Sequence, residues 1–275
     1  MYIVGPLKSG KTSMLTDKFV ELISCGIPSP EILVICANNF KKNIFIEKTK
    51  EKLIKHNIKN IGNIPVYTFN GIVYNSILNN WPLIEEKISD KFPEISIVPN
   101  LCGLDITEYI LKECIKETNS NTIISKTFND YASELNLIHQ LLRRYRLITE
   151  NYLNETEIKQ KSELLREKFC EPAYIALDKL KNKTLKYRSF DYLKQTNTFL
   201  YLLNNGFIND FHTIKYFLAD DLDEMSFAAQ YFINYMSSKA KDFYLAGDKD
   251  GGSRKGYLCA SPESWNNMLT NTNNN

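Results

Sequence analysis

The segment GPLKSGKT, residues 5–12, constrains the fold of this chain more than any other stretch. It fits the pattern G-x-x-x-x-G-K-[ST], with a short apolar run before it and apolar residues at helical spacing from Thr12 to about residue 25. In such a strand–loop–helix context the glycines let backbone N–H groups surround phosphates, and the helix N-terminus adds its positive dipole end. We therefore predict a nucleotide-binding phosphate loop.

The residue types of this loop suggest separate roles. Lys11 is expected to reach the β- and γ-phosphates of ATP, and Thr12 to ligate Mg²⁺. The expected cofactors are thus ATP and Mg²⁺. Contacts with the cofactor are expected from Gly5, Pro6, Ser9, Gly10, Lys11, Thr12 and Ser13. Kinases, switches, transporters and motors all use such loops, so other parts of the chain must decide how the nucleotide is used.

The flanking segments predict an α/β fold with a parallel sheet. Further strands are expected at residues 32–36, 66–69, 214–219 and 242–248, and helices at 40–56 and 227–238. From residue 106 to 203 helical spacing dominates, without a convincing buried strand. We expect one discontinuous α/β domain over residues 1–80 and 205–260, a helical insertion over 81–204, and a disordered, Asn-rich tail over 261–275.

Composition excludes several classes of protein. The net charge of +2 argues neither for nor against nucleic acid, so any basic surface must be local. The six cysteines lie far apart without a CxxC motif, which favours a reducing compartment over a disulfide framework or a zinc site. No apolar run approaches the ~18 residues of a membrane span, and the N-terminus does not resemble a signal peptide. We expect a cytoplasmic protein without membrane contact.

The segment FLADDLDEM, residues 217–225, places four acidic residues directly behind an apolar run. By itself such a cluster is either a solvated turn or a metal site. A phosphate loop elsewhere in the chain favours the metal site, because a carboxylate at a strand end commonly completes the Mg²⁺ coordination of P-loop proteins.

Taken in order, these elements resemble the first RecA-like domain of the UvrD/Rep-type superfamily 1 DNA helicases. The similarity rests on GPLKSGKTSMLTDKFVELISCGIPSPEILVICANN (5–39), VYTFNGI (66–72), FLADDLDEMSFAAQYFI (217–233) and YLAGD (244–248). The helical insertion matches in position only. The resemblance implies a RecA-like P-loop NTPase fold and an ATP-binding, helicase-like protein of DNA replication, repair or recombination.

The resemblance also assigns residues to roles. Asp220 falls where the family holds Mg²⁺, and Asp221 where it has a Glu that polarises the attacking water. Asp221 is shorter by one methylene, and a misplacement of about 1 Å can cost ~10²-fold in rate. The candidate catalytic residues are therefore Lys11 and a weakened Asp221, and the candidate metal ligands are Thr12 and Asp220. Gln230 lies at the family's spacing behind the acidic motif and joins the expected cofactor contacts.

Single-stranded DNA is a possible partner. The family's DNA-contacting blocks are matched here by Asn39, Thr68 and Phe69. Independently, QLLRRYRLITENY (140–152) combines basic and aromatic side chains, which suit phosphate contacts and base stacking, although helices also carry basic faces for solubility. Its candidate contacts are Arg143, Arg144 and Arg146.

Departures from the family pattern limit the expected activity. The sequence stops where the family continues into a second RecA-like domain, whose arginine finger is worth about 10³–10⁵ in rate. We expect that domain as a partner in cis or in trans, and no unwinding by this chain alone. The alternatives are a non-hydrolysing, nucleotide-dependent interaction module, a helicase remnant, and a small-molecule kinase, which the lack of an Arg-rich lid motif disfavours.

Overall fold

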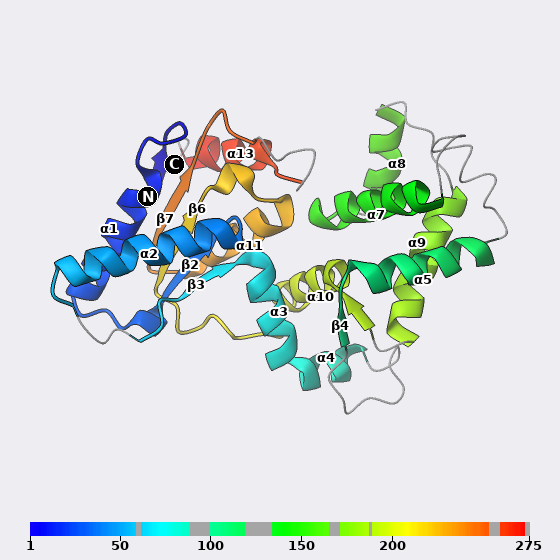
Figure 1. Cartoon of the computed structure of the whole chain (residues 1–275), viewed down its shortest axis with the longest axis horizontal. Coiled ribbons are helices and arrows are strands. Elements are labelled where there is room, and N and C mark those ends of the chain that lie inside the picture. Colours follow the sequence, from blue (N-terminus) through cyan, green and yellow to red (C-terminus); the bar gives the residue numbers. More distant parts are fainter. Residues whose placement is uncertain are drawn as a thin grey trace. The chain divides into compact units, whose positions relative to one another are not determined.

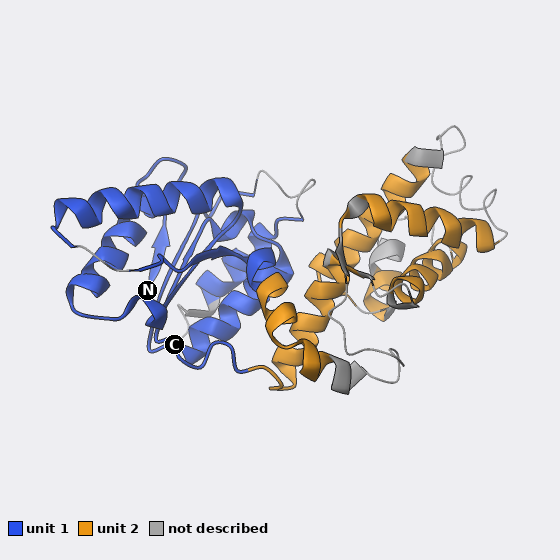
Figure 2. Cartoon of the chain, turned by 60° about the horizontal axis from the view of Figure 1, so that its bottom comes forward, with its two compact units in different colours: residues 1–72, 209–275 blue, residues 73–208 orange. Residues whose placement is uncertain are grey.

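The computed structural model describes residues 1–58, 62–88, 100–118, 134–153, 155–164, 171–186, 189–252 and 259–272. The chain divides into two compact units (Figure 2). Unit 1 comprises residues 1–72 and 209–275, and unit 2 comprises residues 73–208. Within the described ranges, no helix is both long enough and apolar enough to span a membrane.

Unit 1 is built on a five-stranded sheet in which every pairing is parallel. The strand order is β1-β7-β6-β2-β3. The strands are β1 (Tyr2–Val4), β2 (Ile32–Cys36), β3 (Val66–Thr68), β6 (Tyr216–Asp220) and β7 (Asp242–Gly247). All residues of β2 and β6 are buried, as expected where helices cover both faces of a parallel sheet. The α/β prediction and its five strands are confirmed.

Helices lie on both faces of this sheet (Figure 1). Helices α1 (Lys11–Ser24) and α2 (Asn39–Lys55) cover one face, where Leu15, Phe19 and Phe45 pack against alternate residues of β2 and β6. Helices α11 (Phe227–Lys239) and α13 (Pro262–Thr272) lie on the other. Two 3₁₀ turns, η1 (Ser29–Glu31) and η3 (Leu222–Glu224), precede β2 and follow β6.

The C-terminal segment differs from its prediction. A disordered tail was expected from residue 261, but residues 262–272 form α13. Trp265 of this helix is fully buried, and its ring lies so close to Gly247 that a Cβ there would come within 2.7 Å of it. One large apolar side chain therefore anchors a helix whose other residues are mostly polar. Because the segment is so polar, it lacks the regular spacing of apolar residues by which a helix is predicted. Residues 273–275 lie outside the described ranges.

Unit 2 is mainly helical and has its own core. Helix α3 (Phe69–Asn79) begins in unit 1 and continues into unit 2. The others are α4 (Trp81–Ile88), α5 (Leu104–Glu117), α7 (Glu134–Glu150), α8 (Glu155–Leu164), α9 (Glu171–Lys186) and α10 (Tyr192–Asn204). Buried residues of α5, α7, α9 and α10 form one apolar cluster that includes Leu111, Leu141 and Leu180.

Unit 2 also contains a strand that the sequence did not predict. Strand β5 (Ser189–Asp191) pairs in parallel with β4 (Asn100–Cys102), and Phe190 in its middle is fully buried. The expectation that residues 106–203 contain no buried strand was therefore wrong. A three-residue strand is too short to establish an alternating pattern.

Candidate functional site

The phosphate loop passes from β1 to α1 at the carboxyl edge of the sheet. Because the strands are parallel, the segments after β1, β2, β6 and β7 all emerge at this edge, where open α/β sheets place their ligands. Gly10 is the N-cap of α1 at φ 92°, a left-handed backbone that favours glycine, and no side chain caps the helix. The first N–H groups of α1 therefore remain available to an anion.

Lys11 stands at the first position of α1 with its amine turned back over the loop. The side chain is 8% exposed, and Nζ donates hydrogen bonds to the carbonyls of Gly5 and Pro6, the latter at 2.8 Å. Pro6 and Ser9 are exposed at the loop surface. The loop thus gathers an ammonium and an uncapped helix N-terminus, the two features that phosphate binding needs.

Thr12 and Asp220 join the loop to the acidic strand end. The Thr12 hydroxyl donates to Oδ2 of Asp220 at 2.6 Å, and Oδ1 of Asp220 accepts from the backbone N–H of Asp221 at 3.1 Å. Asp220 is 1% exposed, and its burial raises its pKa to about 6, with the charge of Asp221 adding to the rise. The Thr12 hydrogen bond and Lys41 oppose this rise. A cation beside Asp220 would favour its ionised form.

The oxygen donors of Thr12 and Asp220 suit Mg²⁺, which is bound in nucleotide sites by a few protein oxygens together with phosphates and water. In the part of the chain that the structure describes, no group of three or more His, Cys, Asp or Glu side chains is placed to hold a metal. The two protein oxygens of Thr12 and Asp220 are a ligand set for a Mg²⁺ that is shared with phosphates and water.

Asp221 has an unusual backbone and an ionic partner. Its φ and ψ of 57° and 50° lie in the left-handed region, which is uncommon outside glycine. Its Oδ2 lies 2.8 Å from Nζ of Lys41, and the side chains are 12% and 27% exposed, respectively. Lys41 belongs to the first turn of α2, where its backbone N–H donates to the capping side chain of Asn38 at 3.0 Å. Lys41 is one of many lysines on a basic helix, so it could not be singled out from the sequence alone.

A cavity of about 530 Å³ opens between these elements within unit 1. Its described lining contains five carboxylate residues and two lysines, so negative charge is in excess. The lining residues are Leu7, Lys11, Ala37, Asn38, Lys41, Asp221, Asp223, Glu224, Asp248, Asp250, Gly251 and Gly252. Such a cavity can take phosphates only where cations offset its carboxylates.

Asp223 fixes one wall of this cavity. Its Oδ1 accepts a 2.8 Å hydrogen bond from the backbone N–H of Asp248, which links η3 to the segment after β7. A Cβ at Gly251 would come within 2.1 Å of Oδ2 of Asp223, so a larger residue there would require the Asp223 side chain to move. Burial raises the pKa of Asp223. We assign Asp223 to shaping the wall, since its Oδ1 accepts a hydrogen bond from this loop.

Two of the expected cofactor contacts face other parts of unit 1. The side chain of Ser13 accepts from Nζ of Lys52 at 3.0 Å, which ties α1 to α2. Gln230 is fully buried behind the acidic turn, and its Nε2 donates to the carbonyls of residues 222, 225 and 261 at 2.8–3.1 Å. Neither residue lines the cavity. The structure thus gives Gln230 the task of holding η3 against the start of α13.

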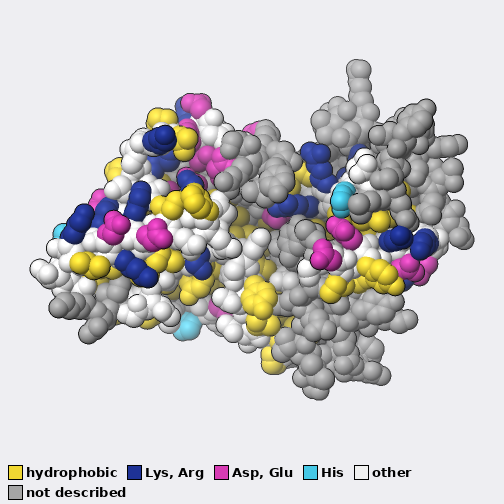
Figure 3. All heavy atoms as spheres, viewed as in Figure 1, with side chains coloured by type: hydrophobic (Ala, Val, Ile, Leu, Met, Phe, Trp, Pro, Cys, Tyr) yellow, Lys and Arg dark blue, Asp and Glu magenta, His cyan; other side chains and the backbone are white. Residues whose placement is uncertain are grey.

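The three DNA candidates of unit 1 differ in accessibility. Asn39 is exposed at the start of α2, next to Phe40, whose side chain is 69% exposed. The Thr68 hydroxyl accepts from the backbone N–H of Gly71 at 3.1 Å. Phe69 is 7% exposed and its ring lies 6.0 Å from that of Phe232, so the ring belongs to the core and is not available for base stacking. On the face seen in Figure 3, basic and acidic side chains are interspersed over unit 1.

The arginines of the helical insertion lie on α7 of unit 2. Arg143 is exposed, and Arg144 and Arg146 are partly exposed. Tyr145, one of the aromatic residues in the segment 140–152 that the sequence suggested for base stacking, is only 2% exposed and belongs to the apolar core of unit 2. That part of the prediction was wrong, because in a helix the residues on either side of an exposed arginine face other directions.

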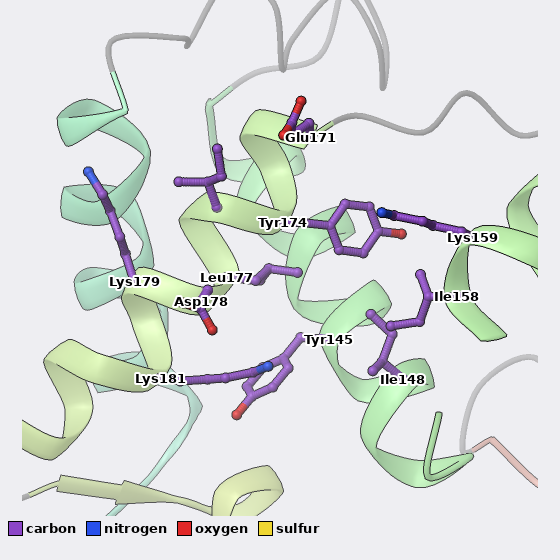
Figure 4. A pocket seen from close by; sticks show the side chains of 11 residues that line it. Tyr145, Ile148, Ile158, Lys159, Glu171, Tyr174, Leu177, Asp178, Lys179 and Lys181 are labelled. Atoms are coloured by element: carbon purple, nitrogen blue, oxygen red, sulfur yellow. The ribbon is translucent and has the colours of Figure 1, made fainter. Parts of the chain in front are cut away.

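A second cavity, of about 360 Å³, lies within unit 2 between α7, α8 and α9. Tyr145, Ile148 and Leu177 contribute apolar surface, and Tyr174 and Lys159 face each other at its edge (Figure 4). Lysines and acids are mixed around it, and none of the residues predicted for the nucleotide site lines it. Of the residues predicted for the nucleotide site, Lys11 and Asp221 line the cavity of unit 1, and Thr12 and Asp220 are their neighbours in the sequence.

Comparison with protein families gives a match that covers most of the chain. The model of a family described as the UvrD/REP helicase N-terminal domain matches residues 8–251, which include most of the phosphate loop, the acidic strand end and unit 2. No curated protein matches the sequence significantly.

Proposed function

Because this chain belongs to the UvrD/REP helicase family, we propose that unit 1 is its RecA-like ATP-binding domain and that Mg·ATP binds in the cavity between the phosphate loop and β6. The observation that carries this proposal is the 2.6 Å hydrogen bond between Thr12 and Asp220. It brings the hydroxyl of the phosphate loop and the acid of the strand end together, as a shared metal ligand set requires.

Each residue has a task in this proposal. The N–H groups of the loop and the start of α1 hold the phosphates, and Lys11 exchanges its carbonyl partners for phosphate oxygens. Thr12 and Asp220 hold Mg²⁺, which supplies neutralisation of phosphate charge when bound. Asp221 orients the attacking water and accepts its proton. Its short side chain makes hydrolysis slow.

The short side chain of Asp221 also supports a second candidate function. With an Asp where the family has a Glu, the domain is suited to bind ATP without hydrolysing it and to present an ordered surface to a partner. Such a nucleotide-dependent interaction module keeps the binding residues and does not need the catalytic acid.

We extend the proposal to partners from the family relationship. Single-stranded DNA is the proposed nucleic acid, with Asn39 at the start of α2 and the arginines of α7 as candidate contacts. A second RecA-like domain, in cis or in trans, is the proposed partner for hydrolysis. The proposed setting is DNA replication, repair or recombination in the cytoplasm.

ATPase assays with and without single-stranded DNA separate the two functions. The motor function predicts slow hydrolysis that DNA stimulates and that Lys11→Ala abolishes, whereas Lys48→Ala, at an exposed position on α2, leaves it unchanged. The interaction-module function predicts ATP binding that is lost in Lys11→Ala, without turnover under either condition. Turnover that survives in Lys11→Ala would contradict both.

A further inference from the structure

Lys41 occupies a position in the cavity that neither the sequence nor the family relationship assigned. It enters from α2, while Lys11 enters from α1, and both line the same cavity. The placement follows from the sheet: β2 and β6 are neighbours with Cys36 opposite Asp220, so the start of α2 lies beside the acidic strand end. The two lysines therefore approach one space from two separate elements.

The charges of the cavity indicate a role for Lys41. Of the described residues that line it, Lys11 and Lys41 are the two basic ones, and five others carry carboxylates. A triphosphate brings further negative charge, and each phosphate group needs donors or cations to offset its loss of water. Lys11 and the N-terminus of α1 contact the phosphates next to the loop. Lys41 then remains to contact the phosphate group that is farthest from the loop.

We propose that Lys41 is a second phosphate-binding residue, which contacts the terminal phosphate of a nucleoside triphosphate and pairs with Asp221 when that phosphate is absent. This inference rests on the proposed function of the site. The ammonium of Lys41 exchanges one anionic partner, the Asp221 carboxylate at 2.8 Å, for another of higher charge. Binding of the third phosphate thereby releases Asp221, and a diphosphate leaves the ion pair intact.

A purely structural role for Lys41 makes a different prediction. If Lys41 only positioned Asp221 or the start of α2, its loss would change the affinities for ATP and ADP by the same factor. A contact with the third phosphate instead changes the ratio of the two affinities.

The test compares Lys41→Met with the matched control Lys42→Met. Both substitutions remove an ammonium from adjacent positions of α2, but Lys42 lines a different surface pocket and its amine lies 5.9 Å from the centre of the Tyr67 ring. Dissociation constants for Mg·ATP and Mg·ADP are measured by titration calorimetry, and thermal unfolding checks that each variant is folded. Lys41→Gln replaces the methionine variant if the latter does not fold.

We expect Lys41→Met to weaken ATP binding by about tenfold or more, as for loss of one charge-assisted hydrogen bond, and ADP binding by less than about threefold. Lys42→Met should leave both affinities near those of the wild type, and Lys41→Arg should retain the preference for ATP. Equal weakening of ATP and ADP, or no weakening of either, overturns the role of Lys41. If the wild-type protein binds neither nucleotide, the proposed function fails and this inference fails with it; if Lys11→Ala weakens binding but Lys41→Met does not, only the inference fails.

Discussion

Thr12 and Asp220 are 208 positions apart in the sequence, and the hydroxyl of one donates a 2.6 Å hydrogen bond to the carboxylate of the other. All of unit 2 lies between them in the chain, yet they meet because β1 and β6 end at the same edge of one parallel sheet. The contact places a buried acid, with a raised pKa, beside the phosphate loop.

Asp220→Asn should stabilise the nucleotide-free protein at pH 8. The folded pKa of Asp220, about 6, lies above its ordinary value of 3.8, so the folded state disfavours the ionised carboxylate. The wild-type protein therefore loses stability as the pH rises from about 4 to 6, and the variant does not. Above that range the variant should be more stable by roughly 2–3 kcal/mol, since each tenfold change in proton affinity is worth about 1.4 kcal/mol.

Urea unfolding at pH 4 and pH 8 measures this difference, with Glu47→Gln, at an exposed carboxylate of α2, as the control. The greater stability of Asp220→Asn should appear at pH 8 and vanish near pH 4. A wild-type protein that is as stable as the Asn variant at pH 8 would show that Asp220 is not strained by its burial.

Asp221→Glu should raise the rate of any ATP hydrolysis, by up to ~10²-fold, because the longer side chain restores the reach that the family's Glu provides. Steady-state phosphate release measures the rate, and the Lys11→Ala/Asp221→Glu double variant sets the background. If turnover is unchanged or falls, the alignment across FLADDLDEM is wrong and another acid of the cavity takes this role.

Lys52→Met should destabilise unit 1 by about 1–3 kcal/mol. The amine of Lys52 lies 2.7 Å from the Asp17 carboxylate and donates to the Ser13 carbonyl and the Thr16 hydroxyl, both at 2.8 Å, so it ties α2 to α1. Chemical denaturation should show the loss, whereas Lys48→Met, at an exposed site on the same helix, should change stability little. Equal effects of both substitutions would mean that the ion pair and hydrogen bonds of Lys52 do not contribute to the stability of unit 1.

Gly247→Ala should destabilise the protein by about 1–3 kcal/mol through overpacking. The added methyl would lie 2.7 Å from Cε2 of Trp265, a rigid and fully buried ring. Thermal unfolding measures the loss, and the smaller ring of Trp265→Phe in the alanine background should recover part of it. No loss in Gly247→Ala would indicate that α13 does not pack on β7 as described.

The parts of the fold that the sequence predicted correctly are those with a strong local pattern. ILVIC (32–36) is apolar throughout because both faces of β2 are covered, and the motif GPLKSGKT fixes the loop between β1 and α1. Helix α13 and strand β5 were missed because each depends on one buried aromatic residue, Trp265 or Phe190, within a short or polar segment. Their stability comes from packing partners that are distant in sequence.

The same distinction holds at the site. Thr12 could be assigned from a local motif and Asp220 from its family resemblance, because each lies in a recognisable segment. Lys41 could not, since only the pairing of β2 with β6 brings it to Asp221. Gln230 and Phe69 match the spacing or residue type expected of contact residues, but their burial is decided by tertiary packing that spacing does not reveal.

Calorimetric titration of Mg·ATP into the wild-type protein and Lys11→Ala shows whether GPLKSGKT forms a nucleotide site. We expect binding of one nucleotide per chain that weakens by about 10²-fold or more when the ammonium of Lys11 is lost, because this ammonium contributes strong, charge-assisted hydrogen bonds to phosphate. Lys48→Ala should bind as the wild type does. Absence of binding to the wild-type protein, or equal binding to Lys11→Ala, would contradict a nucleotide site at GPLKSGKT.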